Sequence, residues 1–253
     1  MAAEATATPV LEARHVAKRF GHVQALRDAS IVVPAGKVVA LVGDNGAGKS
    51  TFMKTLLGIN SPDSGEILID GEPVALTGVR DAQRRGIDAV HQDLALAPEL
   101  SVVDNMFLGH EIVTGPGFLR RRQMADRAVA ALDDLGIRLP SLAVPVRELS
   151  GGQRQAVAVA KAVMWARTAI LLDEPTSALG ARQSEIIAEL MRTVAARGLA
   201  VLVISHDLPR ILKAADTIAV LWRGETVLQA DAATLTVPDL VATMVGYHAE
   251  EAS

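Results

Sequence analysis

The sequence predicts an α/β fold in which a mainly parallel sheet is covered by helices on both faces. Three observations support this prediction. Apolar runs of strand length alternate with helical segments along most of the chain, and such alternation is typical of parallel strands joined by helical crossovers. The run Val38–Val42 is aliphatic throughout, as expected for a strand buried on both faces. A glycine-rich loop follows this run directly, and a helical segment follows the loop.

The composition narrows the function classes. The chain has 253 residues, half of them hydrophobic, which is enough for one large domain or for one domain with an added lobe. Only 3% are aromatic, which argues against base-stacking surfaces. The net charge of −4 gives no general attraction to nucleic acid or anionic lipid. The chain has no cysteine, which excludes disulfides and thiolate metal sites.

The sequence contains no signal that places it in or across a membrane. The first ten residues lack both a basic start and an apolar stretch, so no secretory signal is expected. No uncharged apolar run approaches the roughly 18 residues needed to span a bilayer. We therefore expect a soluble protein whose membrane role, if any, comes through a partner.

The first third of the chain reads mainly as strands. Strands are expected at residues 10–17 and 31–33, with a turn near Gly21 between them. A helix over residues 49–57 follows the glycine-rich loop. Next, three aliphatic residues precede Asp70-Gly71, a dipeptide that indicates a hairpin turn.

The rest of the chain divides into a helical insertion and a return to strands. Residues 98–135 are expected to be mainly helical, ending at Gly136, and the insertion over residues 93–149 is the natural second lobe. An alanine-rich helix is expected over residues 155–167. The remaining expected strands are 169–172, 200–204 and 218–221.

The glycine-rich loop carries the first chemical motif. Gly43-Asp44-Asn45-Gly46-Ala47-Gly48-Lys49-Ser50 matches the P-loop pattern, with the required strand before it and helix after it. The glycines let backbone N–H groups point at phosphates, and the helix start adds a favourable dipole. Lys49 is expected to neutralise phosphate charge and Ser50 to hold Mg²⁺. The alternative, a glycine turn with a surface lysine, explains neither the strand nor the helix.

An acidic pair follows another apolar strand. Asp173 and Glu174 come at the carboxyl end of the strand expected at 169–172, where parallel sheets place their ligands. We assign Asp173 to Mg²⁺ and Glu174 to polarising the attacking water, because phosphoryl transfer depends on positioning and charge stabilisation. By itself such a pair is more often a solvated strand end, and the P-loop favours the functional interpretation.

Three isolated residues have both a structural and a functional interpretation. His206 follows the strand at 200–204 and is either structural or close enough to sense the γ-phosphate. Gln92 follows the short apolar segment 88–90 and could bond Mg²⁺ or the water at the junction with the helical lobe. Phe20 either packs in the core or stacks on adenine, and local sequence does not separate these two alternatives.

The pentapeptide Leu149-Ser150-Gly151-Gly152-Gln153 is the most specific feature of the chain. A specified five-residue string should occur by chance in roughly one chain in a few thousand of this length. Together with the P-loop, the glutamine in VHQD, the ILLDEP strand and His206, it resembles the nucleotide-binding subunit of ABC transporters. The resemblance runs from Phe20 to the neighbourhood of Gly246.

The resemblance implies a P-loop NTPase fold of the ABC ATPase type. This fold has a RecA-like, mainly parallel core, an antiparallel β subdomain and an inserted α-helical lobe. One ABC ATP-binding domain is then expected over residues 1–253. Its core is expected at about 8–92 and 154–247, and its helical lobe at about 93–153.

The family's residue roles transfer onto matching positions, with ATP and Mg²⁺ as cofactors. Phe20 is expected to stack on adenine, and Glu174, His206 and Gln92 are expected to be catalytic. The residues expected to hold Mg²⁺ are Ser50, Gln92 and Asp173. The expected phosphate-binding residues are Gly43, Asn45, Gly46, Ala47, Gly48, Lys49, Ser50 and Thr51. The signature residues Ser150, Gly151, Gly152 and Gln153 are expected to grip the γ-phosphate bound by the opposite subunit.

That last role implies a homodimer of nucleotide-binding domains. A second helix start with free N–H groups suits an anion, although the chain already has one phosphate loop. A dimer in which two half-sites close over two nucleotides accounts for this second anion-binding segment.

Residues 78–111 look like the monosaccharide-import branch, which includes ribose, galactose, xylose and fructose importers. Many ATPases of that branch fuse two halves, whereas this chain carries one half, as in single-domain fructose-type importers. The resemblance implies an ATPase that energises monosaccharide uptake through separate membrane permease subunits and, indirectly, a sugar-binding protein. It would be cytoplasmic and peripheral on the inner face of the cell membrane, with no nucleic-acid partner. The alternatives are an ABC ATPase for another solute or for export, and a non-transport ABC ATPase acting on nucleic acid or ribosomes.

Several positions are left with a second interpretation. The family usually has aspartate where Gly180 follows Ser177-Ala178-Leu179. The resemblance implies that this loop crosses the dimer interface, so the departure bears on coupling between the two sites. Residues 120–122 are three arginines, expected to be a solvated helix start, and the tail from residue 249 is expected to fray. The hydrophobic residues at the start of the lobe are expected to be mostly core, with some lining a groove for a permease helix. They are Leu94, Leu96, Leu100, Met106 and Phe107.

Overall fold

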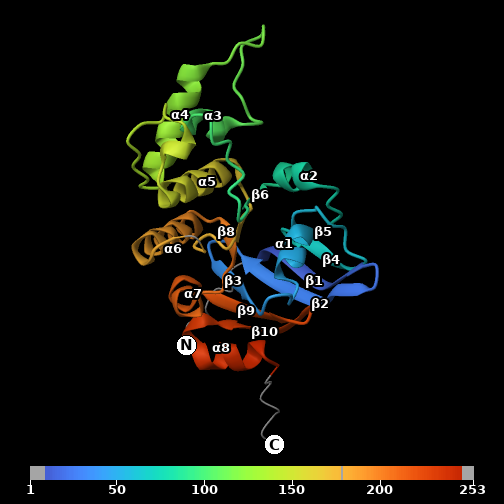
Figure 1. Cartoon of the computed structure of the whole chain (residues 1–253). Coiled ribbons are helices and arrows are strands. Elements are labelled where there is room, and N and C mark those ends of the chain that lie inside the picture. Colours follow the sequence, from blue (N-terminus) through green and yellow to red (C-terminus); the bar gives the residue numbers. More distant parts are fainter. Residues whose placement is uncertain (1–8, 178, 247–253) are drawn as a thin grey trace, which may run out of the picture.

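A computed structural model describes residues 9–177 and 179–246 of the chain (Figure 1). The expectations for Ala178 and for the tail from residue 249 concern residues outside this description.

The described strands form one ten-stranded mixed sheet in the order β5-β4-β1-β2-β10-β9-β3-β8-β7-β6. The run from β9 through β3, β8 and β7 to β6 is parallel, whereas β5, β4, β1 and β2 are antiparallel. The prediction of a mainly parallel core with an antiparallel part is therefore confirmed. The strands are β1 (Pro9–Phe20), β2 (Val23–Pro34), β3 (Val38–Val42), β4 (Ser64–Ile69), β5 (Glu72–Val74), β6 (Ile87–Val90), β7 (Ala169–Asp173), β8 (Ala200–Ile204), β9 (Thr217–Trp222) and β10 (Glu225–Asp231).

The helices cover the parallel part of the sheet and build the lobe. Figure 1 shows α3 and α4 at the top, above α5 and away from the sheet. The helices are α1 (Lys49–Leu56), α2 (Val79–Arg84), α3 (Val102–Phe107), α4 (Arg121–Asp134), α5 (Gly151–Trp165), α6 (Ala181–Ala196), α7 (Leu208–Ala214) and α8 (Val237–Met244), with short 3-10 turns at Val146–Glu148 and Ala232–Thr234. No described helix has the length and apolar character needed to cross a bilayer.

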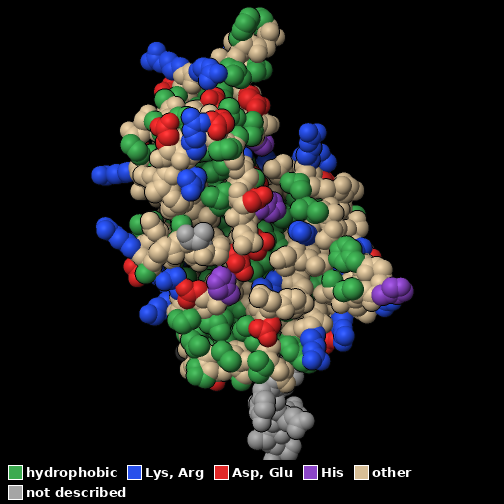
Figure 2. Space-filling model, in the orientation of Figure 1, with side chains coloured by type: hydrophobic (Ala, Val, Ile, Leu, Met, Phe, Trp, Pro, Cys, Tyr) green, Lys and Arg blue, Asp and Glu red, His purple; other side chains and the backbone are tan. Residues whose placement is uncertain are grey.

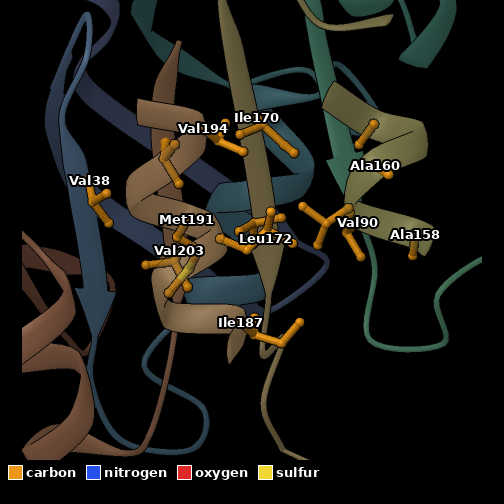
Figure 3. Packing of buried hydrophobic residues seen from close by; sticks show 14 of the residues in the cluster. Val38, Val90, Ala158, Ala160, Ile170, Leu172, Ile187, Met191, Val194 and Val203 are labelled. Atoms are coloured by element: carbon orange, nitrogen blue, oxygen red, sulfur yellow. The ribbon is translucent and has the colours of Figure 1, made fainter. Parts of the chain in front are cut away.

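The central strands are buried on both faces, as the aliphatic run at β3 predicts. Val38, Ala40 and Val42 pack into a core with helices α5 to α8 and the lobe. Val39 and Leu41 face a second core with α1 and the antiparallel strands. Figure 3 shows strand residues of the first core, among them Leu172 and Val203, against side chains of α6. This two-residue alternation separates the cores because successive side chains of a strand point to opposite faces.

Several local predictions hold. The hairpin at Asp70-Gly71 joins β4 to β5, and both turn residues have positive φ (51° and 79°). Helix α4 ends before Gly136, whose φ is 68°. Met106 and Phe107 are fully buried, as expected of lobe core. Leu94 and Leu96 pack against the same core only partly buried, whereas Leu100 is exposed.

Other boundaries were wrong. Strands β1 and β2 each extend over twelve residues, because they pair with each other along most of that length and need only one buried face. Strand β10 and helix α2 were not predicted, since β10 is only half-buried and α2 has six residues. Within the region expected to be helical, residues 108–120 form a loop and a hairpin, where Gly109, Gly115, Pro116 and Gly117 disfavour a helix.

Candidate nucleotide-binding site

The P-loop is fixed by close contacts with the strands around it. A Cβ on Gly43 would lie 2.2 Å from the carbonyl oxygen of Leu221, and one on Gly48 would lie 2.5 Å from that of Ala25. The φ angles of both glycines, 154° and 108°, are ones that other residues rarely adopt. A Cβ on Gly46 would meet nothing within 4 Å, so the middle of the loop is open. The loop is thus held tightly at both ends, whereas Gly46 at its middle faces open space.

Lys49 begins α1 and lies inside this loop. Its Nζ donates to the carbonyl oxygens of Gly43 (2.6 Å) and Asp44 (3.0 Å), and the residue is only 8% exposed. Burial lowers the pKa of Lys49, and the charges of Glu174, Asp44 and Asp173 oppose that shift. A buried ammonium group beside this loop is suited to neutralising a polyphosphate.

Asp173 is the last residue of β7 and lies at the same edge of the sheet. Burial raises the pKa of Asp173 above its ordinary value, and the neighbouring Glu174 raises it further, while His91, Lys54 and Lys49 act in the opposite direction. The acid thus shares one electrostatic environment with the P-loop lysine. The sequence predicted this proximity from two separate motifs.

Glu174 continues from β7 in an unusual backbone conformation. Its φ is 49°, and its N–H donates to the carbonyl of Ile204 at 3.0 Å. Its own carbonyl accepts from the N–H and the hydroxyl of Ser177 (3.2 and 3.1 Å). These bonds hold the left-handed residue in place.

His206 lies beside Glu174. The distance from His206 Nδ1 to Glu174 Oε1 is 3.3 Å. The register of the strands explains this proximity. Asp173 of β7 pairs with Ile204 of β8, and both strands end at that point. The structure therefore brings together Lys49, Asp173, Glu174 and His206.

Gln92 lies two residues beyond β6, which pairs with β7 through Val90 and Leu172. Its side chain is exposed at the same sheet edge. Phe20 ends β1 and is 47% exposed, with Lys18 Nζ 5.6 Å from its ring centroid. The core-packing interpretation of Phe20 is thus wrong, because the residue is exposed.

The signature segment starts α5 in a different part of the molecule. Ser150 caps the helix: its hydroxyl accepts from Gln153 N at 3.3 Å, and its own N–H donates to Gln153 Oε1 at 2.9 Å. The N–H groups of Ser150 and Gln153 are therefore not free as the sequence had predicted, because this capping box occupies them. A Cβ on Gly152 would lie 3.0 Å from Cγ of Gln183 in α6, and Gln183 Oε1 also accepts from Gly180 N at 3.0 Å. Figure 1 shows α5 apart from α1, so the helix starts of the signature segment and of the P-loop lie at separate places in one chain.

The residues at the P-loop fit a magnesium–nucleotide complex. Among the described residues no group of three or more His, Cys, Asp or Glu could hold a metal ion. Mg²⁺ usually binds through one or two protein ligands together with substrate phosphates and water. The exposed Ser50 and the acid Asp173 supply such a small ligand set, and the open loop at Gly46 admits the phosphates.

A protein-family model for ABC transporters matches residues 26–177. The chain belongs to the ABC transporter family. It is 42% identical over 238 residues to the xylose/arabinose import ATP-binding protein of Sulfolobus acidocaldarius, and 41% identical over 245 residues to the fructose import ATP-binding protein of Rhizobium meliloti. Each alignment covers 94% of both chains. The xylose import ATP-binding protein of Burkholderia cenocepacia is 40% identical, and the match covers 46% of its length.

Solved structures support the fold of this ABC ATPase. A nucleotide-free ATP-binding cassette of an ABC transporter superposes with a TM-score of 0.80 at 24% identity, covering 96% of this chain and all of that one. A dimeric ATP-binding cassette in a post-hydrolysis state with ADP and Pi superposes with a TM-score of 0.73 at 25% identity, covering 88% of this chain and 98% of that one. The chain therefore has the ABC ATPase fold that its motifs predicted.

Three residues near the site were not identified from the sequence. His91 lies next to Asp173 because β6 and β7 are in register, which a single sequence does not reveal. Lys54, which also acts on Asp173, is four residues after Ser50, a spacing that could have indicated it. Gln183 contacts the signature segment from α6, and only tertiary packing reveals this.

Proposed function

We propose that this ABC ATPase is the ATP-binding and hydrolysing subunit of an importer that energises monosaccharide uptake through a separate membrane permease. The observation that carries the proposal is the meeting of Lys49, Asp173 and Glu174 at one open anion loop. The sugar-import names of relatives that match over 94% of their length support the cargo class.

We assign the residue roles from this geometry. The loop from Gly43 to Thr51 binds the phosphates through backbone N–H groups, Lys49 neutralises their charge, and the exposed ring of Phe20 stacks on adenine. Ser50, Asp173 and Gln92 are the side chains that would hold Mg²⁺. When bound, Mg²⁺ supplies further neutralisation of charge on the phosphate oxygens.

Glu174 is assigned to orienting and polarising the attacking water. The strained turn between Asp173 and Ser177 directs its carboxylate toward the P-loop side of the sheet, and its charge is felt at Lys49. His206, 3.3 Å away, holds this carboxylate in place and is near enough to the same edge to respond to the γ-phosphate. Catalysis here depends on positioning and electrostatics, as phosphoryl transfer generally does.

The functional unit is proposed to be a homodimer with two composite pockets. The signature residues Ser150 to Gln153 form a second anion-binding helix start, apart from the P-loop of their own chain. In a head-to-tail pair each signature segment closes over the nucleotide held by the other chain. The dimeric cassettes among similar solved structures are consistent with such a pair.

The organisation and location follow from this assignment. We propose one ABC ATP-binding domain, with the core at about 8–92 and 154–247 and the helical lobe at about 93–153. The permease docks beside the lobe, a sugar-binding protein acts through the permease, and nucleic acid takes no part. The ATPase is then peripheral on the cytoplasmic face of the membrane.

Replacing Glu174 by glutamine tests the catalytic assignment. Glu174→Gln should still bind ATP, as measured by calorimetry, and should accumulate as a closed dimer in size-exclusion chromatography. Its turnover should fall about 100-fold or more, because the isosteric amide cannot accept the proton of the attacking water. Normal steady-state hydrolysis by this variant would remove Glu174 from its role.

Mixing two defective variants tests the composite pocket. Lys49→Ala loses the phosphate cradle and Ser150→Arg blocks the clamp, so each should be inactive alone. In a mixed dimer, one pocket combines the intact cradle of one copy with the intact signature of the other. Recovery of hydrolysis on mixing is therefore expected, and failure to recover it with two folded variants contradicts the head-to-tail pair.

Deleting the gene tests the cargo class. Uptake of at least one labelled monosaccharide should disappear and should return with the wild-type gene but not with the Glu174→Gln variant. Unchanged uptake of all the monosaccharides tested would contradict sugar import while leaving the ATPase assignment intact.

A further inference from the structure

A short hairpin between α3 and α4 projects from the helical lobe. It spans residues 112–119, with Val113 paired to Leu119 in an antiparallel bridge. Thr114 N donates to the carbonyl of Phe118 at 2.8 Å, and Arg120 N donates to that of Ile112 at 2.8 Å. Figure 1 shows the segment as a narrow extension at the top of the molecule. Its hydrogen bonds make it a defined structure rather than an irregular loop.

The tip of this hairpin exposes apolar side chains. Phe118 is 74% exposed, Val113 50% and Leu119 40%. Val113 and Leu119 form a directly opposed pair and share one face, so Phe118, one residue along the strand, leaves from the other face. Figure 2 shows hydrophobic side chains at this tip, at the top of the view. The tip is thus an apolar wedge on both faces, unlike scattered exposed aliphatic residues elsewhere.

Phe118 differs from the other phenylalanines of the chain. There are four, of which Phe52 and Phe107 are fully buried and Phe20 lies half-exposed at the end of β1. Phe118 is the most exposed of them. An aromatic-poor chain that presents one of its few rings on a projecting turn has a strongly unfavourable surface there unless something covers the ring.

Three consecutive arginines lie at the base of the hairpin. Arg120, Arg121 and Arg122 follow the hairpin directly, and the nearest acidic residues along the chain are Glu111 before it and Asp126 in α4. All three arginines are exposed, and Arg121 is anchored to Asp104 of α3 at 3.1 Å. Figure 2 shows Lys and Arg side chains beside the tip. The interpretation of these arginines as only a solvated helix start leaves the adjacent apolar wedge unexplained.

We propose that the hairpin inserts its apolar tip into the headgroup region of an anionic lipid membrane, with Arg120 and Arg122 on the lipid phosphates. Aromatic and aliphatic side chains flanked by basic residues are the combination that binds such a surface. A lipid interface can surround a wedge that is apolar on both faces, whereas a flat protein surface covers only one. This contact is additional to the permease and does not require ATP hydrolysis.

The absence of cysteine makes a direct test possible. A single cysteine placed at Pro116 can be labelled with an environment-sensitive nitrobenzoxadiazole dye, and Val129→Cys in α4, 45% exposed in the parent residue, gives the matched site. On vesicles of phosphatidylcholine mixed with phosphatidylglycerol, the dye at residue 116 should shift to the blue and be quenched by spin-labelled lipid. The dye at residue 129 should show neither change.

Variants then separate the two contributions. Phe118→Ser should weaken binding to the mixed vesicles by about tenfold in sedimentation, since a buried ring is removed. Arg120→Gln with Arg122→Gln should weaken it by about tenfold or more, with the effect lost in high salt. Val129→Ser, the matched apolar control, should bind like the wild type.

Two results would overturn the proposal. One is wild-type protein that binds mixed vesicles no better than pure phosphatidylcholine vesicles and gives no blue shift. The other is Phe118→Ser that binds as tightly as wild type. Because vesicle binding is measured without nucleotide, and ATPase activity of each variant is assayed in solution, failure here is distinguishable from failure of the proposed ATPase.

Discussion

The P-loop and the signature segment are both helix starts suited to an anion, yet they are held in different ways. The P-loop is bounded by backbone, with Gly43 and Gly48 pressed against carbonyl oxygens of Leu221 and Ala25. The signature segment meets a side chain instead, since Gly152 faces the flexible Gln183. The first is part of a rigid core, and the second can adjust. This difference suits the proposed roles, in which the P-loop keeps its shape around the phosphates and the signature segment of the partner moves onto them.

Of the substitutions that test this comparison, Gly43→Ala is expected to have the largest effect on stability and ATP binding. Gly43→Ala would place a Cβ 2.2 Å from a backbone oxygen that cannot move without distorting β9. We expect unfolding to become easier by about 3 kcal/mol or more, with loss of ATP binding. Urea denaturation measures the first effect and calorimetry the second. Gly46→Ala is the matched control, because only its positive φ opposes the change, at about 1 kcal/mol. Equal effects at both glycines would contradict the proposed rigidity.

A smaller effect on the free energy of unfolding is expected at the signature segment. Gln183→Ala removes the oxygen that accepts from Gly180 N and should lower the free energy of unfolding by about 1 kcal/mol. Gly152→Ala should be harmful in the wild type, because its Cβ crowds Gln183, and better tolerated beside Gln183→Ala. A double-mutant cycle by urea denaturation should give a coupling of about 1 kcal/mol. Strict additivity would mean that the two residues do not share this contact.

Replacing Asp173, at the end of β7, should increase stability and reduce activity. The pKa of Asp173 is raised in the folded protein, so folding is opposed by its ionisation: the unfavourable contribution is absent below the ordinary carboxyl pKa and grows as pH rises through the raised folded value. Asp173→Asn should therefore raise the melting temperature by a few degrees at neutral pH and little at acidic pH. ATPase activity should fall. A variant equally stabilised at both pH values would contradict burial as the cause.

The smallest effect is expected from an acid of the lobe with the opposite shift. Hydrogen bonds from backbone N–H groups, chiefly that of Gly109, lower the pKa of Glu111. Its stabilising contribution is present above the ordinary carboxyl pKa and is lost as pH falls through the lowered folded value. Glu111→Gln should reduce stability slightly at neutral pH, by a few tenths of a kcal/mol at most, because the group is exposed to solvent. Differential scanning calorimetry at two pH values measures the sign, and stabilisation at neutral pH would contradict this prediction.

Local patterns were enough where burial is complete and the motif is contiguous. The strands β3, β7 and β8 are short aliphatic runs buried on both faces, and the P-loop needs only the strand before it and the helix after it. Partly buried elements were harder to predict. Strand β10 alternates weakly, α2 has two turns at most, and the hairpin at 112–119 lies within a region whose flanks are helical. Their sequences are also compatible with loops, and contacts with the rest of the protein decide which structure forms.

The sequence by itself determined the α/β class, the phosphate loop, the acidic strand end and the membership of the ABC transporter family, because each depends on residues adjacent along the chain. Only the tertiary structure decided that His91 and His206 flank the acidic pair, that Phe20 is exposed, that Gln183 packs on the signature segment and that Phe118 stands on a projecting wedge. Those facts depend on strand register and on contacts between residues far apart in sequence. Such contacts form only when the whole chain buries its two cores.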